Sequence, residues 1–241
     1  MDYVRLDNLG YQISGRKILQ DINVGFSKNK VTAIIGKSGG GKSTLIRVIN
    51  GLLKPTEGTV TIDKLTVGIS NARTLRKDIG YTVQGIGLFP HLSAKENILL
   101  PEKVFGNSLR THERFSEVAQ LVNLPSHTFE KYPYQLSGGE QQRAAVARAL
   151  FLDPPLLLMD EPFASLDPIT RFNIQDEFVQ LQRSAPRTVL IVTHDLREAR
   201  KLADDILVID QGSMAQFGPS REIFENPKTD IVKELLTAAG L

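Results

Sequence analysis

The fold is decided by the stretch Val31-Thr32-Ala33-Ile34-Ile35-Gly36-Lys37-Ser38-Gly39-Gly40-Gly41-Lys42-Ser43, an apolar run that leads directly into a glycine-rich loop. Such a run is typical of a strand that is covered on both faces. A helix is predicted from Thr44 to Asn50, and the Pro and Gly of residues 54–58 mark the turn that ends it. Strand, glycine loop and helix follow one another in the order that a phosphate-binding site requires.

The loop has the residue types that hold a triphosphate. Glycines allow backbone N–H groups to converge on phosphate oxygens, and the following helix adds its positive N-terminus. Lys42 supplies a cation for the β and γ phosphates, and Ser43 supplies a hydroxyl for Mg²⁺. The residues expected to bind nucleotide are Gly36, Lys37, Ser38, Gly39, Gly40, Gly41, Lys42, Ser43 and Thr44. The loop alone does not separate kinases, GTPases, helicases and transporters, and a chance glycine turn is the alternative.

Two carboxylates follow another apolar run. Residues Leu156 to Met159 predict a buried strand, and Asp160 and Glu161 come directly after it. Because successive strand residues point to opposite sides, we expect the two carboxylates to reach different targets. One can serve a metal ion while the other faces an attacking water, where a general base contributes ~10²- to 10⁴-fold. The alternative is that both acids simply face solvent.

A second glycine element, Ser137-Gly138-Gly139-Glu140, precedes a run of helix formers that reaches Leu150 without Gly or Pro. The pattern predicts a helix N-terminus with a hydroxyl and two unhindered amides, which is a second phosphate-binding surface. The chain thus has two such surfaces but one lysine loop. A simple N-cap with a flexible glycine pair is the alternative.

The rest of the chain alternates between strand and helix patterns. Ile22, Val24 and Phe26 alternate with polar residues as in a half-buried strand, and the region from Glu96 to Leu150 is helical. Further predicted elements are strands at Ile79 to Val83, Val189 to Val192 and Ile206 to Ile209, and two short helices around Asn226-Pro227. This alternation indicates an α/β fold with a largely parallel sheet.

The composition excludes several classes of protein. The 241 residues are 41% hydrophobic, which is enough for an α/β core. The apolar runs are far shorter than the ~20 residues that cross a bilayer, and no secretory signal is expected in residues 1–10. The absence of cysteine excludes disulfides and thiolate metal sites. A formal charge of +2, with dispersed basic residues, gives no indication of nucleic acid binding.

Taken in order, the phosphate loop, the Ser137 element, the carboxylate pair and His194 resemble the ATP-binding subunit of an ABC transporter, over nearly the whole chain from Tyr11 to about Phe224. The resemblance implies an α/β P-loop NTPase (RecA-like) core with a mostly parallel sheet, an N-terminal antiparallel β element and an inserted α-helical subdomain. It implies one domain over residues 1–241, with residues 1–86 and 151–241 as the core and residues 87–150 as the helical subdomain with the signature motif. ATP and Mg²⁺ are the implied cofactors.

The resemblance also implies a role for each candidate catalytic residue. Glu161 is the general base, Asp160 assists Mg²⁺, and Gln84 reaches both Mg²⁺ and the water. His194 contacts the γ-phosphate, and Tyr11 stacks on adenine. Taken alone, His194 and Tyr11 are each also typical of a structural residue.

Further residues are implied to act between two copies of the chain. In a head-to-tail homodimer or pseudo-dimer, the signature residues Ser137, Gly138, Gly139 and Glu140 close over the γ-phosphate held by the other copy. Asp167, in the segment Ser165-Leu166-Asp167, belongs to the loop that crosses the dimer interface.

Two segments resemble a particular branch of the family. Residues 84–92 (Gln-Gly-Ile-Gly-Leu-Phe-Pro-His-Leu) look like the import type, in which this surface receives a coupling helix from the membrane permease. Residues 167–171 (Asp-Pro-Ile-Thr-Arg) are similar to importers of the quaternary-amine osmoprotectants glycine betaine, choline and carnitine. Two departures are Gly85, where glutamine is often found, and an end near residue 241 without the C-terminal regulatory domains that many such subunits carry. Lys37 stands where proline is usual and should be tolerated, because only its backbone is required.

The resemblance predicts a peripheral protein at the cytoplasmic face of the cell membrane, where ATP hydrolysis powers the uptake of quaternary ammonium osmoprotectants. Its expected partners are the permease, a second copy of the chain and, indirectly, a solute-binding protein. A polar amino-acid importer is the nearest alternative for the solute. From a different class, the alternative is a soluble ABC ATPase of DNA repair or translation. The DNA-repair members insert long coiled coils or zinc modules, and this sequence has no cysteine and no long heptad segment.

Overall fold

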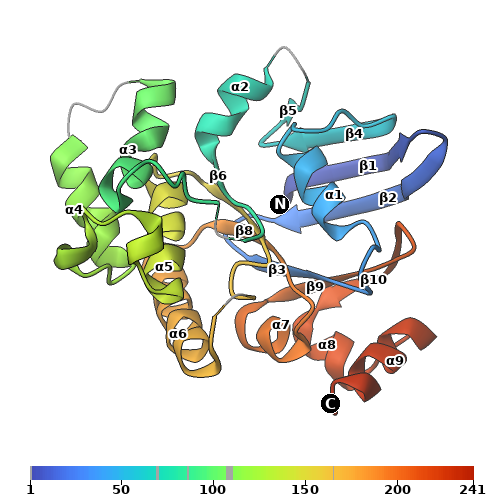
Figure 1. The fold of residues 1–241 in the computed structure, drawn as a ribbon. Coiled ribbons are helices and arrows are strands. Elements are labelled where there is room, and N and C mark those ends of the chain that lie inside the picture. Colours follow the sequence, from blue (N-terminus) through green and yellow to red (C-terminus); the bar gives the residue numbers. More distant parts are fainter. Residues whose placement is uncertain (1, 69–70, 86, 107–110, 165) are drawn as a thin grey trace. The chain divides into compact units, whose positions relative to one another are not determined.

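The computed structural model describes residues 2–68, 71–85, 87–106, 111–164 and 166–241. The chain forms two compact units (Figure 1). Unit 1 comprises residues 1–76 and 187–241, and unit 2 comprises residues 77–186. Within the described residues, no helix is both long and apolar enough to span a bilayer.

Unit 1 begins with an antiparallel sheet in the order β2-β1-β4-β5. Its strands are β1 (Asp2–Ile13), β2 (Arg16–Ser27), β4 (Glu57–Ile62) and β5 (Leu65–Thr66). Ile22, Val24 and Phe26 of β2 are buried, whereas Asn23 between them is exposed. The predicted half-buried strand and the N-terminal antiparallel element are both confirmed.

A second set of strands in unit 1 has the order β10-β9-β3-β8. The central strand β3 (Val31–Ile35) runs parallel to β8 (Thr188–Val192) and β9 (Asp205–Asp210), and β10 (Ser213–Pro219) is antiparallel to β9. Every residue of β3 and β8 is buried, as their apolar runs predict. The phosphate loop therefore leaves the sheet from a strand that is paired on both sides.

The helices of unit 1 are α1 (Lys42–Ile49), α2 (Ala72–Leu75), α7 (Leu196–Leu202), α8 (Ser220–Glu225) and α9 (Asp230–Ala238). Helix α1 begins at Lys42, earlier than the predicted Thr44, because Gly41 with φ 103° serves as its N-cap. The loop lysine is thus already part of the helix. Helices α8 and α9 confirm the two predicted helices around Asn226-Pro227.

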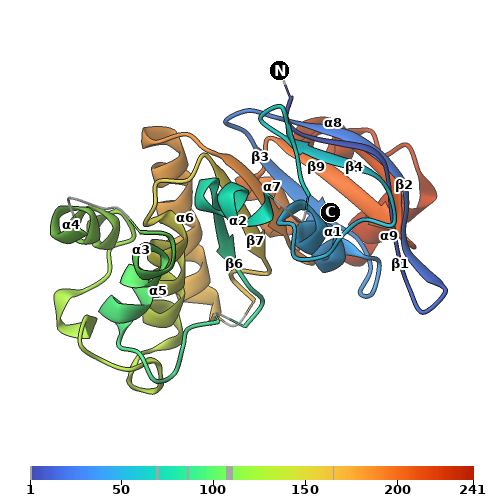
Figure 2. The same ribbon diagram turned by 90° about the horizontal axis from the view of Figure 1, so that it is seen from above.

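Unit 2 combines a parallel strand pair with a group of helices (Figure 2). Strand β6 (Ile79–Thr82), which follows the short turn η1 (Arg76–Asp78), runs parallel to β7 (Leu156–Asp160). The helices are α3 (Ala94–Phe105), α4 (Thr111–Leu121), α5 (Gly138–Leu150) and α6 (Pro168–Ser184), with the short turns η2 (Ser126–Thr128) and η3 (Pro133–Gln135). Helix α5 packs against α3, α4, α6 and β6. The compact unit therefore includes the predicted helical region 87–150 and extends beyond it to β6, β7 and α6.

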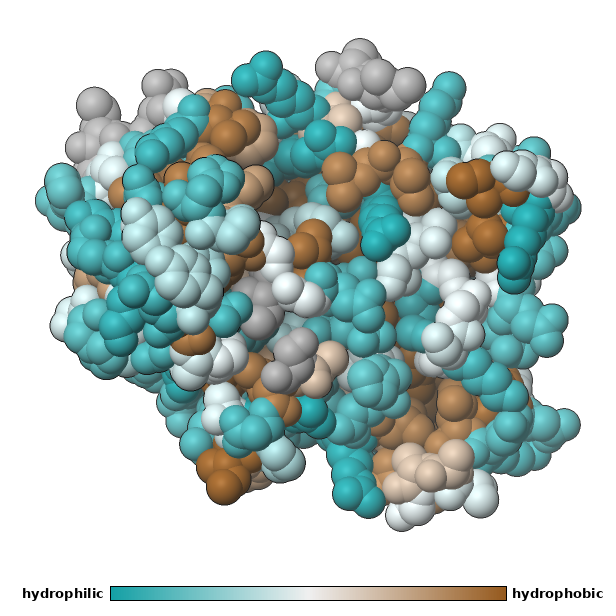
Figure 3. All heavy atoms as spheres, viewed as in Figure 1, coloured by the Kyte–Doolittle hydropathy of each residue, from teal (hydrophilic) through white to brown (hydrophobic). Residues whose placement is uncertain are grey.

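The surface is mixed in character. On the face seen in Figure 3, hydrophobic side chains form separate patches among hydrophilic ones. In unit 2 the exposed apolar side chains include Phe89, Tyr134, Ile169 and Phe172. Phe89 belongs to the segment 84–92 that is predicted to receive a permease.

Candidate functional site

The predicted site residues are divided between the two units. Unit 1 contains Tyr11, the phosphate loop with the start of α1 (residues 36–44) and His194. Unit 2 contains Gln84, Asp160, Glu161, the signature residues 137–140 and Asp167. Two residues of the predicted motifs, Ile86 and Ser165, lie outside the described residues.

The phosphate loop of unit 1 is fixed by its own backbone. Gly36 has φ 147°, and a Cβ atom placed on it would lie 2.0 Å from the carbonyl oxygen of Ile209. The N–H of Gly212 donates to the carbonyl oxygen of Gly40 at 3.1 Å, so the turn between β9 and β10 supports the loop. Both its φ and this close approach require glycine at position 36.

Lys42 is buried at the start of α1, and its ammonium bridges the loop. Nζ donates to the carbonyl oxygens of Gly36 and Lys37 at 2.8 Å each. Ser43 and Thr44 follow in the first turn of α1, and both are half-buried. A helix N-terminus, an ammonium group and two hydroxyls therefore lie at the carboxyl end of a parallel strand, where α/β proteins bind anions.

A basic pocket adjoins the loop within unit 1. Its lining includes Arg16, Lys17 and Gln20 of β2 together with Ser38 and Gly39 of the loop. Positive charge beside the glycines raises the local concentration of a polyphosphate. The sequence analysis did not single out Arg16 and Lys17, because basic residues in a hairpin usually face solvent.

Tyr11 and His194 are the other predicted nucleotide contacts of unit 1. Tyr11 is half-buried on β1 and lines a second pocket together with Lys17 and Gln20. Since Lys17 and Gln20 line both pockets, Tyr11 and the phosphate loop border adjoining pockets. His194 is exposed between β8 and α7. Stacking on adenine by Tyr11 and phosphate contact by His194 stay predictions.

In unit 2 the predicted catalytic residues meet at the ends of β6 and β7. Asp160, the last residue of β7, is fully buried, and Glu161 follows it with φ 48°. Because β6 and β7 pair in parallel, Gln84 lies beside Glu161, and its Nε2 donates to Glu161 Oε2 at 3.1 Å. A positive φ on a residue that carries a side chain costs ~1–3 kcal/mol, and such strain collects at functional sites. The strain at Glu161 could not be foreseen from the sequence.

The signature residues form the N-terminus of α5, as predicted. Ser137 is the N-cap, and its Oγ accepts the N–H of Glu140 at 3.3 Å, while the Glu140 carboxylate accepts the N–H of Ser137 at 2.7 Å. Desolvation opposes ionisation of Glu140, but hydrogen bonds from Ser137, together with the nearby Lys131 and His127, outweigh it and lower the pKa of Glu140. Ser137 and Gly138 are exposed, whereas Gly139 is buried. Phosphate binding at this capping box stays a prediction.

Asp167 is the exposed N-cap of α6. Its Oδ1 accepts the N–H of Ile169 at 3.2 Å and that of Thr170 at 3.1 Å. Hydrogen bonds from the side chain and backbone of Thr170 hold the pKa of Asp167 below its usual value. The carboxylate thus stabilises the start of α6, and a contact across a dimer interface stays a prediction.

Residues 84–92, here called the docking loop, are exposed at Gln84 and at Phe89, which is 44% exposed. Asn97 of α3 hydrogen-bonds the backbone of Phe89, and Arg148 of α5 donates to the carbonyl oxygen of Gly87 at 2.9 Å. Sequence reasoning missed Asn97 and Arg148, because a polar residue within a helix carries no signal of a partner in a distant segment.

Lys37 has a side-chain partner as well as a backbone role. Its Nζ donates to the two carboxylate oxygens of Glu234 in α9, at 2.9 and 3.0 Å. This contact ties the phosphate loop to the C-terminal helix of unit 1. It was not foreseen, because only the backbone of Lys37 was expected to matter.

Comparison with known proteins gives a consistent result. Residues 19–164 match the model of a family described as ABC transporter. The chain is 42% identical over 223 residues to the carnitine transport ATP-binding protein OpuCA of Listeria monocytogenes, an alignment that covers 92% of this chain and 56% of that protein. It is 38% identical over 239 residues to the glycine betaine uptake system ATP-binding protein YehX of Escherichia coli, covering 99% of this chain and 78% of that protein. The chain thus spans little more than half the length of the first relative.

Among solved structures, the chain resembles an ATP-binding cassette described as a dimer in a post-hydrolysis state bound to ADP and Pi. The TM-score is 0.81 at 33% identity, covering 90% of this chain and 99% of the other. The predicted P-loop NTPase fold is confirmed.

Proposed function

Since this chain belongs to the ABC transporter family, we propose that it is an ATP-binding subunit that hydrolyses ATP to power solute uptake through a separate membrane permease. The observation that carries the hydrolysis is the hydrogen bond between Gln84 and Glu161 at the ends of two neighbouring parallel strands. An amide donor fixes the orientation of the carboxylate, as a general base acting on water requires. The strained φ of Glu161 supports the same role.

The phosphate loop fits ATP. The loop combines glycine backbone, the buried Lys42 and the positive N-terminus of α1, with Arg16 and Lys17 in the adjoining pocket. Gly39 has φ 74°, and nothing lies within 4 Å of the position that its Cβ would take, so this side of the loop is open to a ligand. We assign Lys42 to the β and γ phosphates and Tyr11 to the adenine ring.

Mg²⁺ fits residues that supply single oxygen ligands. In the part of the chain that the structure describes, no group of three or more His, Asp or Glu side chains could hold a metal ion. Mg²⁺ in nucleotide sites uses one or two protein ligands and takes the rest from phosphates and water. We assign Ser43, Gln84 and Asp160 to it, and the ion supplies charge neutralisation for the transferred phosphate.

Replacing Glu161 with Gln tests the assignment of the base. The amide has the same shape but cannot accept the proton of the water, so turnover should fall by about 10²- to 10⁴-fold while ATP binding is retained. ATPase rate, ATP affinity and gel filtration with ATP and Mg²⁺ are the measurements, and Glu113→Gln on the exposed face of α4 is the control. Normal hydrolysis by Glu161→Gln would remove Glu161 from this role.

We further propose that the chain acts as a homodimer in which the signature of one copy closes over the γ-phosphate bound by the other. The exposed Ser137 and Gly138 at the positive end of α5 support this, as does the dimeric form of the similar cassette. Gly138→Asp and Lys42→Ala should each be inactive alone. When they are mixed, both changes can fall on one composite site and leave the other intact, so partial activity should return. Two chains that fail to complement each other would contradict this arrangement.

The proposed solute is a quaternary ammonium osmoprotectant, and the proposed place is the cytoplasmic face of the cell membrane. The support is the naming of the relatives for carnitine and glycine betaine transport. A quaternary ammonium group is recognised by aromatic cages through cation–π contacts, and that recognition belongs to a solute-binding protein rather than to this chain.

Uptake measurements test the solute. Cells that lack and then regain this chain should lose and regain uptake of radiolabelled glycine betaine and choline, with glutamine and histidine as controls. Loss of amino-acid uptake alone would favour the polar amino-acid importer and leave the ATPase assignment intact.

A further inference from the structure

The docking loop is shaped from α3 by one buried side chain. Asn97 is fully buried, and its Oδ1 accepts the N–H of Phe89 at 2.8 Å. Its Nδ2 lies within hydrogen-bond distance of the carbonyl oxygens of Phe89 (3.1 Å), Leu92 (3.0 Å) and Ser93 (3.0 Å). These contacts satisfy backbone groups that a strand or helix would pair within itself. Residues 89–92 of the loop therefore have a defined shape without regular secondary structure.

A second side chain reaches the same loop from α5. Arg148 donates from Nη1 to the carbonyl oxygen of Gly87 at 2.9 Å, and its guanidinium carbon lies 6.0 Å from the centre of the Phe89 ring. His91 packs edge-on to the Phe89 ring at 5.9 Å. Burial lowers the pKa of Arg148, yet a guanidinium remains charged at neutral pH. The guanidinium of arginine is planar, so it can donate in a fixed direction and lie over a ring at the same time. The ammonium of lysine lacks this geometry.

Helix α5 is held by its own capping box and by contacts with α4 and α6. At its N-terminus the capping box of Ser137 and Glu140 closes the first turn. Further along, Arg143 pairs with Glu177 of α6 and donates to the carbonyl oxygen of Val122 at 2.7 Å. The part of α5 that precedes Arg148 is thus tied to α6 through Arg143.

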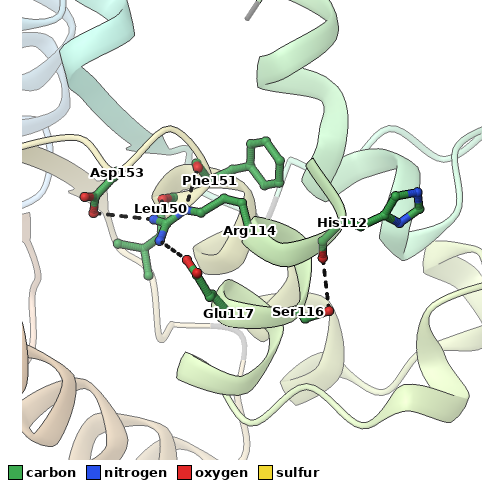
Figure 4. Close-up of polar contacts among 7 residues, drawn as sticks. All are labelled: His112, Arg114, Ser116, Glu117, Leu150, Phe151 and Asp153. Atoms are coloured by element: carbon green, nitrogen blue, oxygen red, sulfur yellow. Dashed lines mark hydrogen bonds and ion pairs between the residues drawn. The ribbon is translucent and has the colours of Figure 1, made fainter. Parts of the chain in front are cut away.

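The C-terminal end of α5 is capped from α4. Arg114 donates from Nη2 to the carbonyl oxygen of Leu150 at 2.7 Å and from Nε to that of Phe151 at 2.9 Å (Figure 4). The guanidinium also contacts the carboxylates of Glu117 and Asp153. Because the last carbonyl groups of a helix have no intrahelical partner, this arginine completes the helix end. Helix α5 is therefore capped at both ends and paired with α6 in its middle.

We propose that Arg148 is a positioning residue that couples the docking loop to the signature helix. The inference rests on the proposed function, in which a permease segment binds at Phe89. When the permease segment binds against the Phe89 ring, the ring and the Gly87 carbonyl group shift. Arg148 contacts both groups, so it shifts α5 with them. The 13 residues of α5 span about 20 Å. The docking loop thereby controls Ser137 and Gly138, which lie at the opposite end of the helix.

Arg148→Lys tests this coupling, because it keeps the charge but loses the directed donor and the planar group that lies over the Phe89 ring. The chain is reconstituted in liposomes with the membrane permease that co-purifies with it, and ATPase rates are compared with those of the purified chain. The basal kcat and the KM for ATP should stay near the wild-type values. The stimulation of hydrolysis by the permease should fall about tenfold, the size expected for loss of one hydrogen bond from a charged donor.

Arg114→Lys is the matched control, since Arg114 contacts α5 but not the docking loop. It should leave stimulation by the permease intact. Hydrogen exchange on the purified chains gives a second readout: the amides of residues 87–92 should exchange faster in Arg148→Lys than in Arg114→Lys.

The possible results separate the two proposals. Wild-type stimulation in Arg148→Lys would overturn the coupling role, and so would an equal loss of the basal and the stimulated rates, which indicates a merely structural residue. Absence of ATP hydrolysis by the wild-type chain would instead refute the proposed function, before any variant is compared.

Discussion

The phosphate loop of unit 1 and the docking loop of unit 2 both contain glycine and both follow a strand of a parallel pair, yet they are held in different ways. The phosphate loop takes its shape from backbone conformation, with Gly36 at φ 147° and Gly40 hydrogen-bonded to Gly212. The docking loop takes its shape from Asn97 and Arg148, which lie on two helices further along the chain. Replacing a glycine should therefore destabilise the phosphate loop, whereas shortening a side chain on a distant helix should destabilise the docking loop.

The largest effect is expected from Gly36→Ala. A Cβ atom 2.0 Å from the Ile209 carbonyl oxygen cannot be accommodated without moving the turn between β9 and β10. Overpacking and the unfavourable φ together should reduce the free energy of unfolding by more than about 3 kcal/mol, a large share of the stability of a domain. Urea unfolding of the purified chain measures this loss.

Gly39→Ala is the control for that prediction. Gly39 also has positive φ, 74°, but nothing lies within 4 Å of the added atom. The cost should be about 1 to 2 kcal/mol, since only the conformational term remains. Equal losses from the two substitutions would show that close contact with Ile209 does not define the loop.

The second prediction concerns the docking loop. Asn97→Ala removes the partner of the Phe89 N–H and the side-chain donor of the Phe89 and Leu92 carbonyl groups, whereas the Ser93 carbonyl keeps its bond from the backbone N–H of residue 97. The free energy of unfolding should fall by about 2 to 3 kcal/mol, because buried backbone groups lose their hydrogen bonds. The exposed Asn173 on α6 provides the control, and Asn173→Ala should change stability by less than about 0.5 kcal/mol. If Asn97→Ala were as mild as Asn173→Ala, the loop would not depend on this side chain.

A smaller effect is expected when the ion pair between Lys37 of the phosphate loop and Glu234 of α9 is removed. The side chains of Lys37 and Glu234 are 52% and 61% exposed, so solvent and salt screen their attraction. Lys37→Ala should lower the free energy of unfolding by at most about 1 kcal/mol, and less at high salt. Unfolding in low and high salt checks this. A loss as large as that of Gly36→Ala would mean that side chains, not backbone, shape this loop.

The contrast also explains how much of the molecule could be predicted from the sequence. Strands β3 and β8 of unit 1 were predicted because burial on both faces demands a continuous apolar run, whereas β1, β4, β5 and β10 were not predicted individually. The phosphate loop was predicted because glycine spacing itself encodes its backbone shape. The start of α1 was placed too late, because Lys42 looks like a loop residue while its backbone is already helical.

Other features had no signal in the sequence. Arg114, Asn97 and Arg148 are polar residues on helices, and such residues usually face solvent. Their partners are backbone carbonyl and amide groups, which every residue type carries, so no pairing of residue types could reveal them. The strained φ of Glu161 depends on how β7 ends against its neighbours and is likewise invisible in a residue pattern.

The smallest predicted effect lies where the docking loop meets α3. The N–H of Ser93 donates to Glu96 Oε2 at 2.8 Å, and hydrogen bonds from the backbone and side chain of Ser93 lower the pKa of Glu96. Because the folded-state pKa lies below the value of about 4.3 for an unfolded glutamate, the ionised carboxylate stabilises the folded state above that pH. This contribution is lost as the pH falls through the lowered folded-state pKa.

In Glu96→Gln the amide oxygen can still accept the Ser93 N–H but carries no charge. The wild type should therefore be slightly more stable than Glu96→Gln at neutral pH, and urea unfolding at a series of pH values should show the difference shrinking in acid. A difference that stays constant between neutral pH and pH values below about 4.3 would show that the charge of Glu96 does not stabilise this junction.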